Sequence, residues 1–324
     1  MAIVSLPEHK KEISLGISAC LMGQKVRYNG DHKKSSYCTN LLSRYFNFVT
    51  VCPEVGIGLP IPRKPIRLVG DMHHYRVKGT DDPTLDVTDQ LYDYGRQKAE
   101  ELDGISGYIL MQKSPSCGME RVKVYHENGS PLGRSEAGMF ARALMEARPL
   151  LPVEEEGRLH DPVLRENFIN RVIAYHHWHE DVLTDLTYKK MGDFHARYKY
   201  QLMAHDQQAY TVLGQLIAQG KTIPLEKMSK DYFEQFMTLM KKKANRKSHT
   251  NVLLHILGYL KKSISSADKQ QLLKQIENYR SGTIPLIVPL TVLKHFVEVH
   301  GSEYIQNQYY LEPHPEAMGL RNNL

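Results

Sequence analysis

Three of the four cysteines each follow a predicted strand. These cysteines, with the apolar segments before them, are Cys20 after residues 13–19, Cys52 after residues 48–51 and Cys117 after residues 105–112. In an open α/β sheet, ligands bind outside the carboxyl ends of the strands, so thiols that are distant in sequence can meet at that edge. Zinc and iron-sulfur clusters both accept soft sulfur ligands. Three thiolates instead of four would leave one metal position open for catalysis.

The fourth cysteine, Cys38, lies near a predicted helix start, so we expect it to stay outside the metal site. An alternative for every cysteine is a place in the core, because free cysteine is among the most buried residue types. The residues near the three strand-end cysteines favour a metal site. Glu54 lies two residues beyond Cys52, and two serines precede Cys117 closely. A carboxylate and hydroxyls beside a metal are groups that handle protons.

The first half alternates apolar runs with helix-like segments at 39–46 and 89–102. This alternation predicts βαβ units and a parallel sheet. Glycine and proline shape the loops, as at residues 56–63, and such loops often carry function. An acidic patch at 154–156 follows a proline-containing stretch. We therefore place one domain at residues 1–155 and a second at residues 156–324.

The second half has helical periodicity. Phe168, Val172 and Tyr175 share one face, and a second face holds Val252, Ile256, Tyr259 and Leu260. Stop signals at Gly220 and at Ser281-Gly282 separate the helices. The predicted fold is an α/β N-terminal domain with an open, mostly parallel, Rossmann-like sheet, followed by an all-α domain.

The composition is that of a folded protein, with 41% hydrophobic and 24% charged residues in a chain of 324. The first apolar stretch follows the charged run from Glu8 to Glu12 without a cleavage site, so we expect no signal peptide. Nowhere do about 20 apolar residues run together, so no membrane span is expected. Four cysteines are too few for a disulfide framework in a chain of this length, and they fit the reducing cytoplasm.

At these residues the sequence resembles the thiouracil desulfidase family. The matching segments are 17–23, 27–30, 51–55, 58–63, 86–88 and 113–118. Their order, spacing and residue types agree over roughly residues 13–150. The second half resembles a helical domain often fused behind this one, through segments 165–168, 194–199, 249–253, 284–291 and 307–315. The fused arrangement is similar to tRNA 4-thiouridine desulfidases.

The resemblance implies a [4Fe-4S] cluster whose fourth iron is free to bind the sulfur of the substrate. The implied ligands are Cys20, Cys52 and Cys117. It also implies catalytic roles for Glu54, as a proton shuttle, and Ser114, which would orient the base or water. Ser116 would cap the loop or bond a cluster sulfur. Ser116 and Arg63 are weaker candidates for substrate contact, and Arg63 is alternatively the salt-bridge partner of Glu54. The products would be uracil or uridine and hydrosulfide, without net redox change.

The net charge of +6 is unevenly placed: residues 1–158 have 21 Lys+Arg against 20 Asp+Glu, and residues 159–324 have 21 against 16. The window 221–262 holds ten Lys+Arg against three acids. Its central cations are Lys241, Lys242, Lys243, Arg246 and Lys247. Such a patch suits RNA phosphates, although a charge run is often only a solvated helix face.

Tyrosines near this basic window offer rings on which bases could stack; they are Tyr198, Tyr200, Tyr232 and Tyr259. The prediction is therefore a desulfidase acting on thiolated tRNA. Two alternatives stay open. One is a desulfidase of free 2- or 4-thiouracil whose helical half is a scaffold, and the other is an RNA-binding protein without catalysis in which zinc staples the cysteines.

Overall fold

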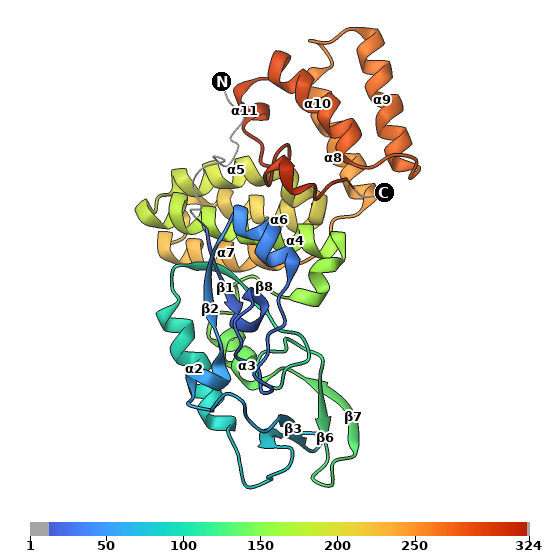
Figure 1. Cartoon of the computed structure of the whole chain (residues 1–324). Helices are drawn as coiled ribbons and strands as arrows, with labels where there is room; N and C mark the ends of the chain where they lie inside the picture. The colour runs from blue at the N-terminus through green and yellow to red at the C-terminus, as the bar shows by residue number, and fades with distance from the viewer. Residues whose placement is uncertain (1–12, 323–324) are drawn as a thin grey trace. The chain divides into compact units, whose positions relative to one another are not determined.

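The computed structural model describes residues 13–322 (Figure 1). They form two compact units that divide between Asp161 and Pro162. The predicted boundary between residues 155 and 156 coincides with the end of the last strand of the first unit. The run from Glu8 to Glu12, used above against a signal peptide, lies outside the described residues.

Four parallel strands form the main sheet of the first unit, in the order β2-β1-β5-β8. They are β1 (Ser14–Ser18), β2 (Asn47–Val51), β5 (Ile105–Leu110) and β8 (Val153–Glu155). All six residues of β5 are buried, as in a strand covered on both faces. Ser18 pairs with Val51, so β1 and β2 end at the same level. This sheet confirms the predicted parallel α/β architecture.

A second, mixed sheet with the order β4-β3-β6-β7 was not predicted. Its strands are β3 (Ile66–Gly70), β4 (Tyr75–Gly79), β6 (Val122–Tyr125) and β7 (Pro131–Glu136). Strands β3 and β6 are parallel, and each has an antiparallel hairpin partner. Inward positions such as Leu68, Val77 and Val124 are fully buried and build a small core of their own. The segments between the main strands are thus folded hairpins and not long loops.

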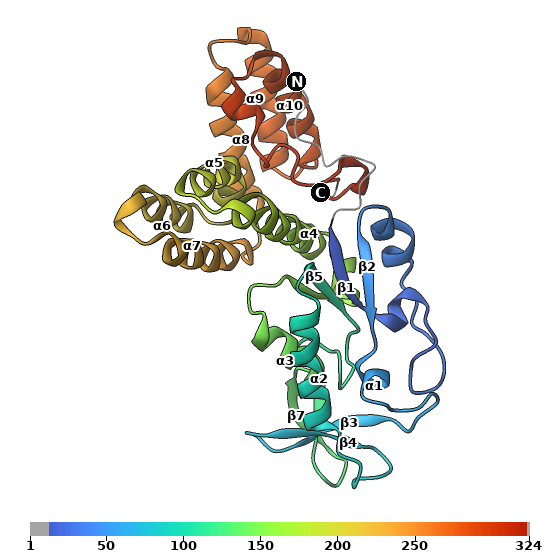
Figure 2. The same ribbon diagram turned by 90° about the vertical axis from the view of Figure 1, so that its left-hand side faces the viewer.

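The helices of the first unit are α1 (Pro53–Gly56), α2 (Thr88–Glu101) and α3 (Met139–Ala147). Figure 2 shows α2 and α3 side by side along the main sheet. The helix-like segment at 39–46 forms only a π-helical turn at Tyr37–Leu41 and a 3-10 turn at Leu42–Arg44. The predicted helix at 89–102 corresponds to α2.

The second unit is helical, as predicted. Its helices are α4 (Pro162–His177), α5 (Tyr188–His205), α6 (Gln207–Ala218), α7 (Leu225–Met240), α8 (Arg246–Leu260), α9 (Ser266–Arg280), α10 (Ile287–His300) and α11 (Glu303–Gln306). Figure 1 shows α8, α9 and α10 packed on one another. Asn245 starts α8 with a reciprocal capping box to Ser248.

Aromatic side chains fill the core of this second unit. Trp178 stacks on Phe233 with ring centroids 4.9 Å apart. Tyr198, Tyr200 and Tyr232 are at most 3% exposed, so the hypothesis that they stack RNA bases is wrong. They lie on helix faces that point into the core, where burial of their large rings stabilises the fold. Tyr259 is instead 48% exposed, so its predicted place on a buried face with Ile256 is also wrong.

Candidate active site

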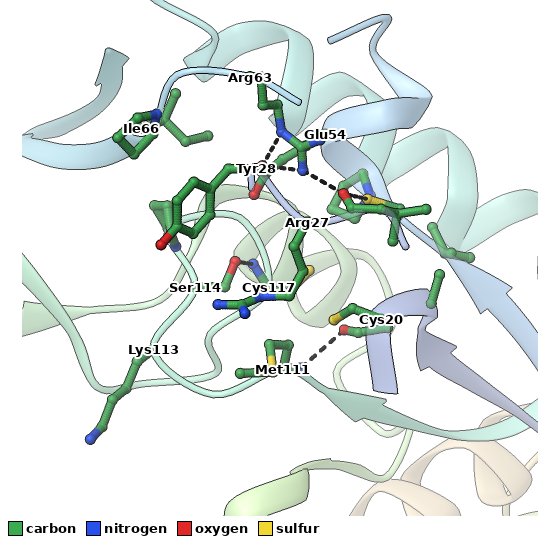
Figure 3. A pocket seen from close by; sticks show the side chains of 18 of the residues that line it. Cys20, Arg27, Tyr28, Glu54, Arg63, Ile66, Met111, Lys113, Ser114 and Cys117 are labelled. Carbon is green, nitrogen blue, oxygen red and sulfur yellow. Dashed lines mark hydrogen bonds and ion pairs between the residues drawn. The ribbon is translucent and has the colours of Figure 1, made fainter. Parts of the chain in front are cut away.

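A cavity of about 400 Å³ opens at the carboxyl ends of β1, β2 and β5 (Figure 3). Three loops that follow these strands supply most of its walls. Strand β1 lies between β2 and β5. The chain goes from β1 to β2 on one side and later to β5 on the other side, so the strand order reverses at β1. Ligand sites in open α/β sheets occur at such a switch point. The cavity volume falls within the range of about 300–1,000 Å³ that is usual for small-molecule sites.

The structure brings Cys20, Cys52 and Cys117 to this cavity. Cys20 lies in the 3-10 turn Ala19–Met22 directly after β1, and Cys52 lies between β2 and α1. Cys117 lies within the loop between β5 and β6. The fourth thiol, Cys38, is fully buried and is not among the lining residues. The three cysteines that follow strands thus share one space, as the sequence pattern predicts.

Burial raises the pKa of each of the three thiols. The pKa of Cys20 rises to about 11, first through burial and then through the neighbouring Cys52. The pKa of Cys117 is raised well above its usual value by burial, although a hydrogen bond with Ser18 lowers it. Thiolates so close together need a cation to offset their charge. Three soft donors without a fourth cysteine fit a cluster with three protein ligands. Within residues 13–322, no three Cys, His, Asp or Glu side chains are placed so that they could hold a single metal ion.

Glu54 lies in the cavity wall with both carboxylate oxygens engaged. The Arg63 guanidinium donates to Oε2 at 2.7 Å, and the Ser116 hydroxyl donates to Oε1 at 2.8 Å. The side chains of Arg63 and Glu54 are only 5% and 14% exposed. Arg63 also donates to the Val26 carbonyl at 2.8 Å. The salt bridge considered as the alternative for Glu54 is therefore present, and it holds the carboxylate in place beside the thiols.

The structure gives the two serines beside Cys117 different hydrogen-bond partners. Ser114, not Ser116, caps the cysteine loop, because its Oγ accepts hydrogen bonds from the backbone N–H of Ser116 and of Cys117 at 3.2 and 3.1 Å. Ser116 is fully buried and its hydroxyl donates to Glu54, so the prediction that it caps the loop is wrong. It acts on the cavity through Glu54.

Among the lining residues that were not predicted, Arg27 and Tyr28 matter most for the site. Arg27 lowers the pKa of Cys20, against the effect of burial, and Figure 3 shows its side chain extending into the cavity. Tyr28 lies beside it, 43% exposed, with the Arg27 guanidinium 5.5 Å from its ring centroid. Their signal in the sequence was the turn at residues 27–30, which follows the first cysteine closely.

The predicted basic cluster lies in the second unit, around the turn between α7 and α8. Lys242 pairs with Asp206, and Arg246 donates to the Tyr279 carbonyl at 2.7 Å. Lys243 and Lys247 are exposed. The cluster is therefore partly neutralised by the fold, which residue counting could not show.

Comparison with known proteins agrees with this geometry. Residues 15–156 match the family model described as 2-thiouracil desulfurase, and residues 199–315 match one described as a protein of unknown function, DUF1722. The uncharacterized protein YbbK of Bacillus subtilis strain 168 is 31% identical over 153 residues, which are 45% of this chain and 97% of the relative. The chain belongs to the 2-thiouracil desulfurase family.

Two other similar proteins also align with about half of the chain. The uncharacterized protein YbgA of Escherichia coli strain K12 is 34% identical over 154 residues, 47% of this chain and 91% of the relative. A solved structure, the [4Fe-4S]-dependent thiouracil desulfidase TudS, is 35% identical, covers 48% of this chain and 98% of that chain, and has a TM-score of 0.36. This member of the desulfurase family therefore joins the matched domain to a second, helical unit.

Proposed function

We propose that this chain removes sulfur from thiolated uracil by hydrolysis, with 4-thiouridine in tRNA as its substrate. The observation that carries the proposal is the meeting of three thiols and a fixed carboxylate in one cavity at the ends of three adjacent parallel strands. Membership of the desulfurase family supports the same reaction. A tRNA substrate would place this activity in the cytoplasm.

Cys20, Cys52 and Cys117 would hold a [4Fe-4S] cluster, since their thiols line the cavity and Cys38 does not. When bound, the cluster supplies a Lewis-acidic iron for the sulfur of the substrate. Burial of the thiols supports this assignment, because their raised pKa values mean that a cationic partner is needed to keep them as thiolates.

Protons would be moved by the chain's own carboxylate. Glu54 takes the proton of the water that attacks the ring carbon, because its carboxylate is fixed by Arg63 and Ser116 at the cavity wall. The carbon gains a bond to oxygen and loses its bond to sulfur, which leaves as hydrosulfide. No electrons are gained or lost in this hydrolysis.

Ser114 would orient the base. Its Oγ already accepts two backbone N–H groups, so its own hydrogen is directed elsewhere and can bond an oxygen or nitrogen of the ring. Tyr28 offers an exposed ring at the same cavity on which the base could stack. Exposed Lys243 and Lys247 support contact with RNA phosphates.

The test is anaerobic incubation of the iron-reconstituted protein with thiolated tRNA and, separately, with free 2- and 4-thiouracil. Loss of thiocarbonyl absorbance and release of hydrosulfide are measured. Turnover of the tRNA alone supports the full proposal. Turnover of free base alone would limit the function to small molecules, and a colourless zinc protein without turnover would overturn it.

A further inference from the structure

The helical unit contains its own cavity, of about 360 Å³, which the desulfidase proposal does not use. Its walls come from α4, α5, the turn between α7 and α8, and the segment near Arg321. Six buried polar side chains line it, which is unusual for the interior of a helical unit: Asn167, Asn170, Gln201, His205, His249 and Arg321. The cavity therefore needs an explanation beyond packing.

Three polar atoms in these walls are buried without a hydrogen-bond partner among the described residues. They are Asn170 Oδ1, Gln201 Oε1 and Arg321 Nη2, on side chains whose residues are 5%, 2% and 4% exposed. Buried polar groups are nearly always paired, because an unpaired group loses its bonds to water without replacement. All three side chains line the cavity, so a ligand bound there would supply the missing partners.

The hydrogen bonds that Gln201 and Arg321 already make determine which of their atoms are left for a ligand. His205 donates from Nδ1 to the Lys242 carbonyl, so its Nε2 must accept, and the Gln201 amide N–H₂ donates to it at 3.2 Å. The Gln201 oxygen is thereby left as an acceptor for a ligand N–H. Arg321 uses Nε on Glu166 at 2.8 Å and Nη1 on the Tyr310 carbonyl at 2.7 Å, so Nη2 is left to donate.

The charge around the cavity is also specific. Burial disfavours the Glu166 carboxylate, but Arg321 and His314 hold its pKa below the usual value, so the pair stays ionised. Burial lowers the pKa of His249 to about 3, so this imidazole is neutral. The remaining cation in the wall is Arg246, at the N-terminal end of α8, where helix geometry favours an anion.

We infer that this cavity binds a nucleotide, with its base directed toward Asn170, Gln201 and Arg321 and its phosphate at Arg246. A nucleobase edge offers N–H donors beside carbonyl or ring-nitrogen acceptors, which is the complement of these three groups. The same chemistry occurs in a free mononucleotide and in one nucleotide of an RNA. The inference does not depend on the desulfidase proposal.

The experiment measures binding to the full-length protein by calorimetry, with AMP, CMP, GMP and UMP, their nucleosides and inorganic phosphate as separate ligands. A tRNA transcript without thiolated bases is tested by fluorescence anisotropy, so that the cysteine site is not engaged by its own substrate. Asn170→Leu removes the unpaired amide oxygen and keeps the branched shape of the side chain. Gln208→Leu, on the exposed side of α6, is the matched control.

We expect Asn170→Leu to weaken binding by about tenfold or more, and the control to bind normally. If Asn170→Leu weakens binding of a free nucleotide, that nucleotide is the ligand. If it weakens binding of the transcript alone, the ligand is one nucleotide of an RNA. The melting temperature without ligand should stay equal or rise, because an unpaired buried group is replaced by an apolar one. If the Leu variant does not fold, Asn170→Ala takes its place. Binding of inorganic phosphate as tight as any nucleotide, or no effect of the variants, would overturn the inference.

Discussion

The Glu54 carboxylate is held by two hydrogen-bond donors, unlike a mobile surface carboxylate. This arrangement determines the expected effect of replacing Glu54. Its two oxygens receive one charged and one neutral donor, and both partners are buried. Bonds of this kind keep a general base within reach of its substrate at a constant angle. None of the three thiols donates to Glu54 itself, although Cys52 donates to the Val26 carbonyl that also accepts from Arg63.

Glu54→Gln is therefore expected to keep the iron content and to lower kcat by about 10² to 10⁴, the usual contribution of general base catalysis. The side chain keeps its shape but no longer accepts a proton. Iron analysis and steady-state kinetics check this, with the exposed Glu127→Gln as control. A variant that turns over normally would rule out Glu54 as the proton acceptor.

Cysteine substitutions separate ligands from core residues. Cys20→Ala, Cys52→Ala and Cys117→Ala should each lose iron, since every ligand of a three-cysteine site is needed. Cys38→Ala is the matched control, because this thiol is also buried and its pKa is also raised to about 11 by burial. Iron content and visible absorbance are measured after anaerobic reconstitution. Iron loss in Cys38→Ala would contradict the assignment.

At the scale of elements, the start of α3 packs directly on the cysteine loop. A Cβ added at Gly138 would lie 2.6 Å from the Ser116 carbonyl carbon and 2.7 Å from the Ser114 oxygen. These are backbone atoms, which cannot rotate away. The loop keeps its shape only because residue 138 has no side chain.

Gly138→Ala should therefore displace the loop and lower iron content and turnover, although its φ of −65° and ψ of 149° suit alanine. Gly104→Ala is the control, since nothing lies within 4 Å of its added Cβ. Iron content and circular dichroism are compared in both variants. Full iron loading of Gly138→Ala would show that the loop can shift and still hold the cluster.

A buried histidine on α4 makes the helical unit sensitive to acid. Burial lowers the pKa of His177 from 6.5 to about 3, and its Nδ1 bonds the Tyr198 hydroxyl at 2.8 Å. Between these two pH values the unfolded chain binds more protons than the folded one, so stability falls as pH falls. At pH 5 this residue alone should account for a loss of about 1 to 2 kcal/mol.

His177→Phe should remove that share of the pH dependence. Urea unfolding is followed between pH 7 and pH 5 for the wild type, for this variant and for exposed His255→Phe. The slope of unfolding free energy against pH is compared, because loss of the Tyr198 bond lowers the absolute value. An unchanged slope would mean that His177 is protonated in the folded state.

Local sequence patterns predicted three of the four strands of the main sheet and the cysteines after them, because strand ends and thiols are both visible in a single segment. They missed β8, since Glu154 and Glu155 were interpreted as an acidic patch at the domain boundary although both are buried. The second sheet escaped prediction, since pairing of β3 with β6 joins residues 68 and 124, far apart in the chain. Helical spacing also placed Tyr198 and Tyr232 near the basic window but could not say which face was buried. The Glu54–Arg63 pair was foreseen only as an alternative, as nine residues separate its members.

At the scale of the whole molecule, the desulfurase family match and the basic turn lie in different units. No helix within residues 13–322 is long and apolar enough to cross a membrane. The net charge of +6 derives almost wholly from the helical half, and two of its exposed cations, Lys243 and Lys247, carry the RNA prediction.

Replacing both lysines by glutamine should weaken tRNA binding and reduce the slope of log K against log salt by up to about 2, or roughly one for each phosphate that is no longer neutralised. Turnover of free thiouracil should stay the same, because neither lysine lines the cysteine cavity. Anisotropy titrations over a range of salt give the slope. An unchanged slope would move the RNA surface elsewhere.

The hydrogen bond from Ser116 to Glu54 joins the loop after β2 to the loop after β5 without any metal. This hydrogen bond connects the two loops through protein atoms alone, in contrast to small zinc domains that unfold when a chelator is added. The two loops should therefore keep their positions when iron is removed from the three thiols that we propose as its ligands.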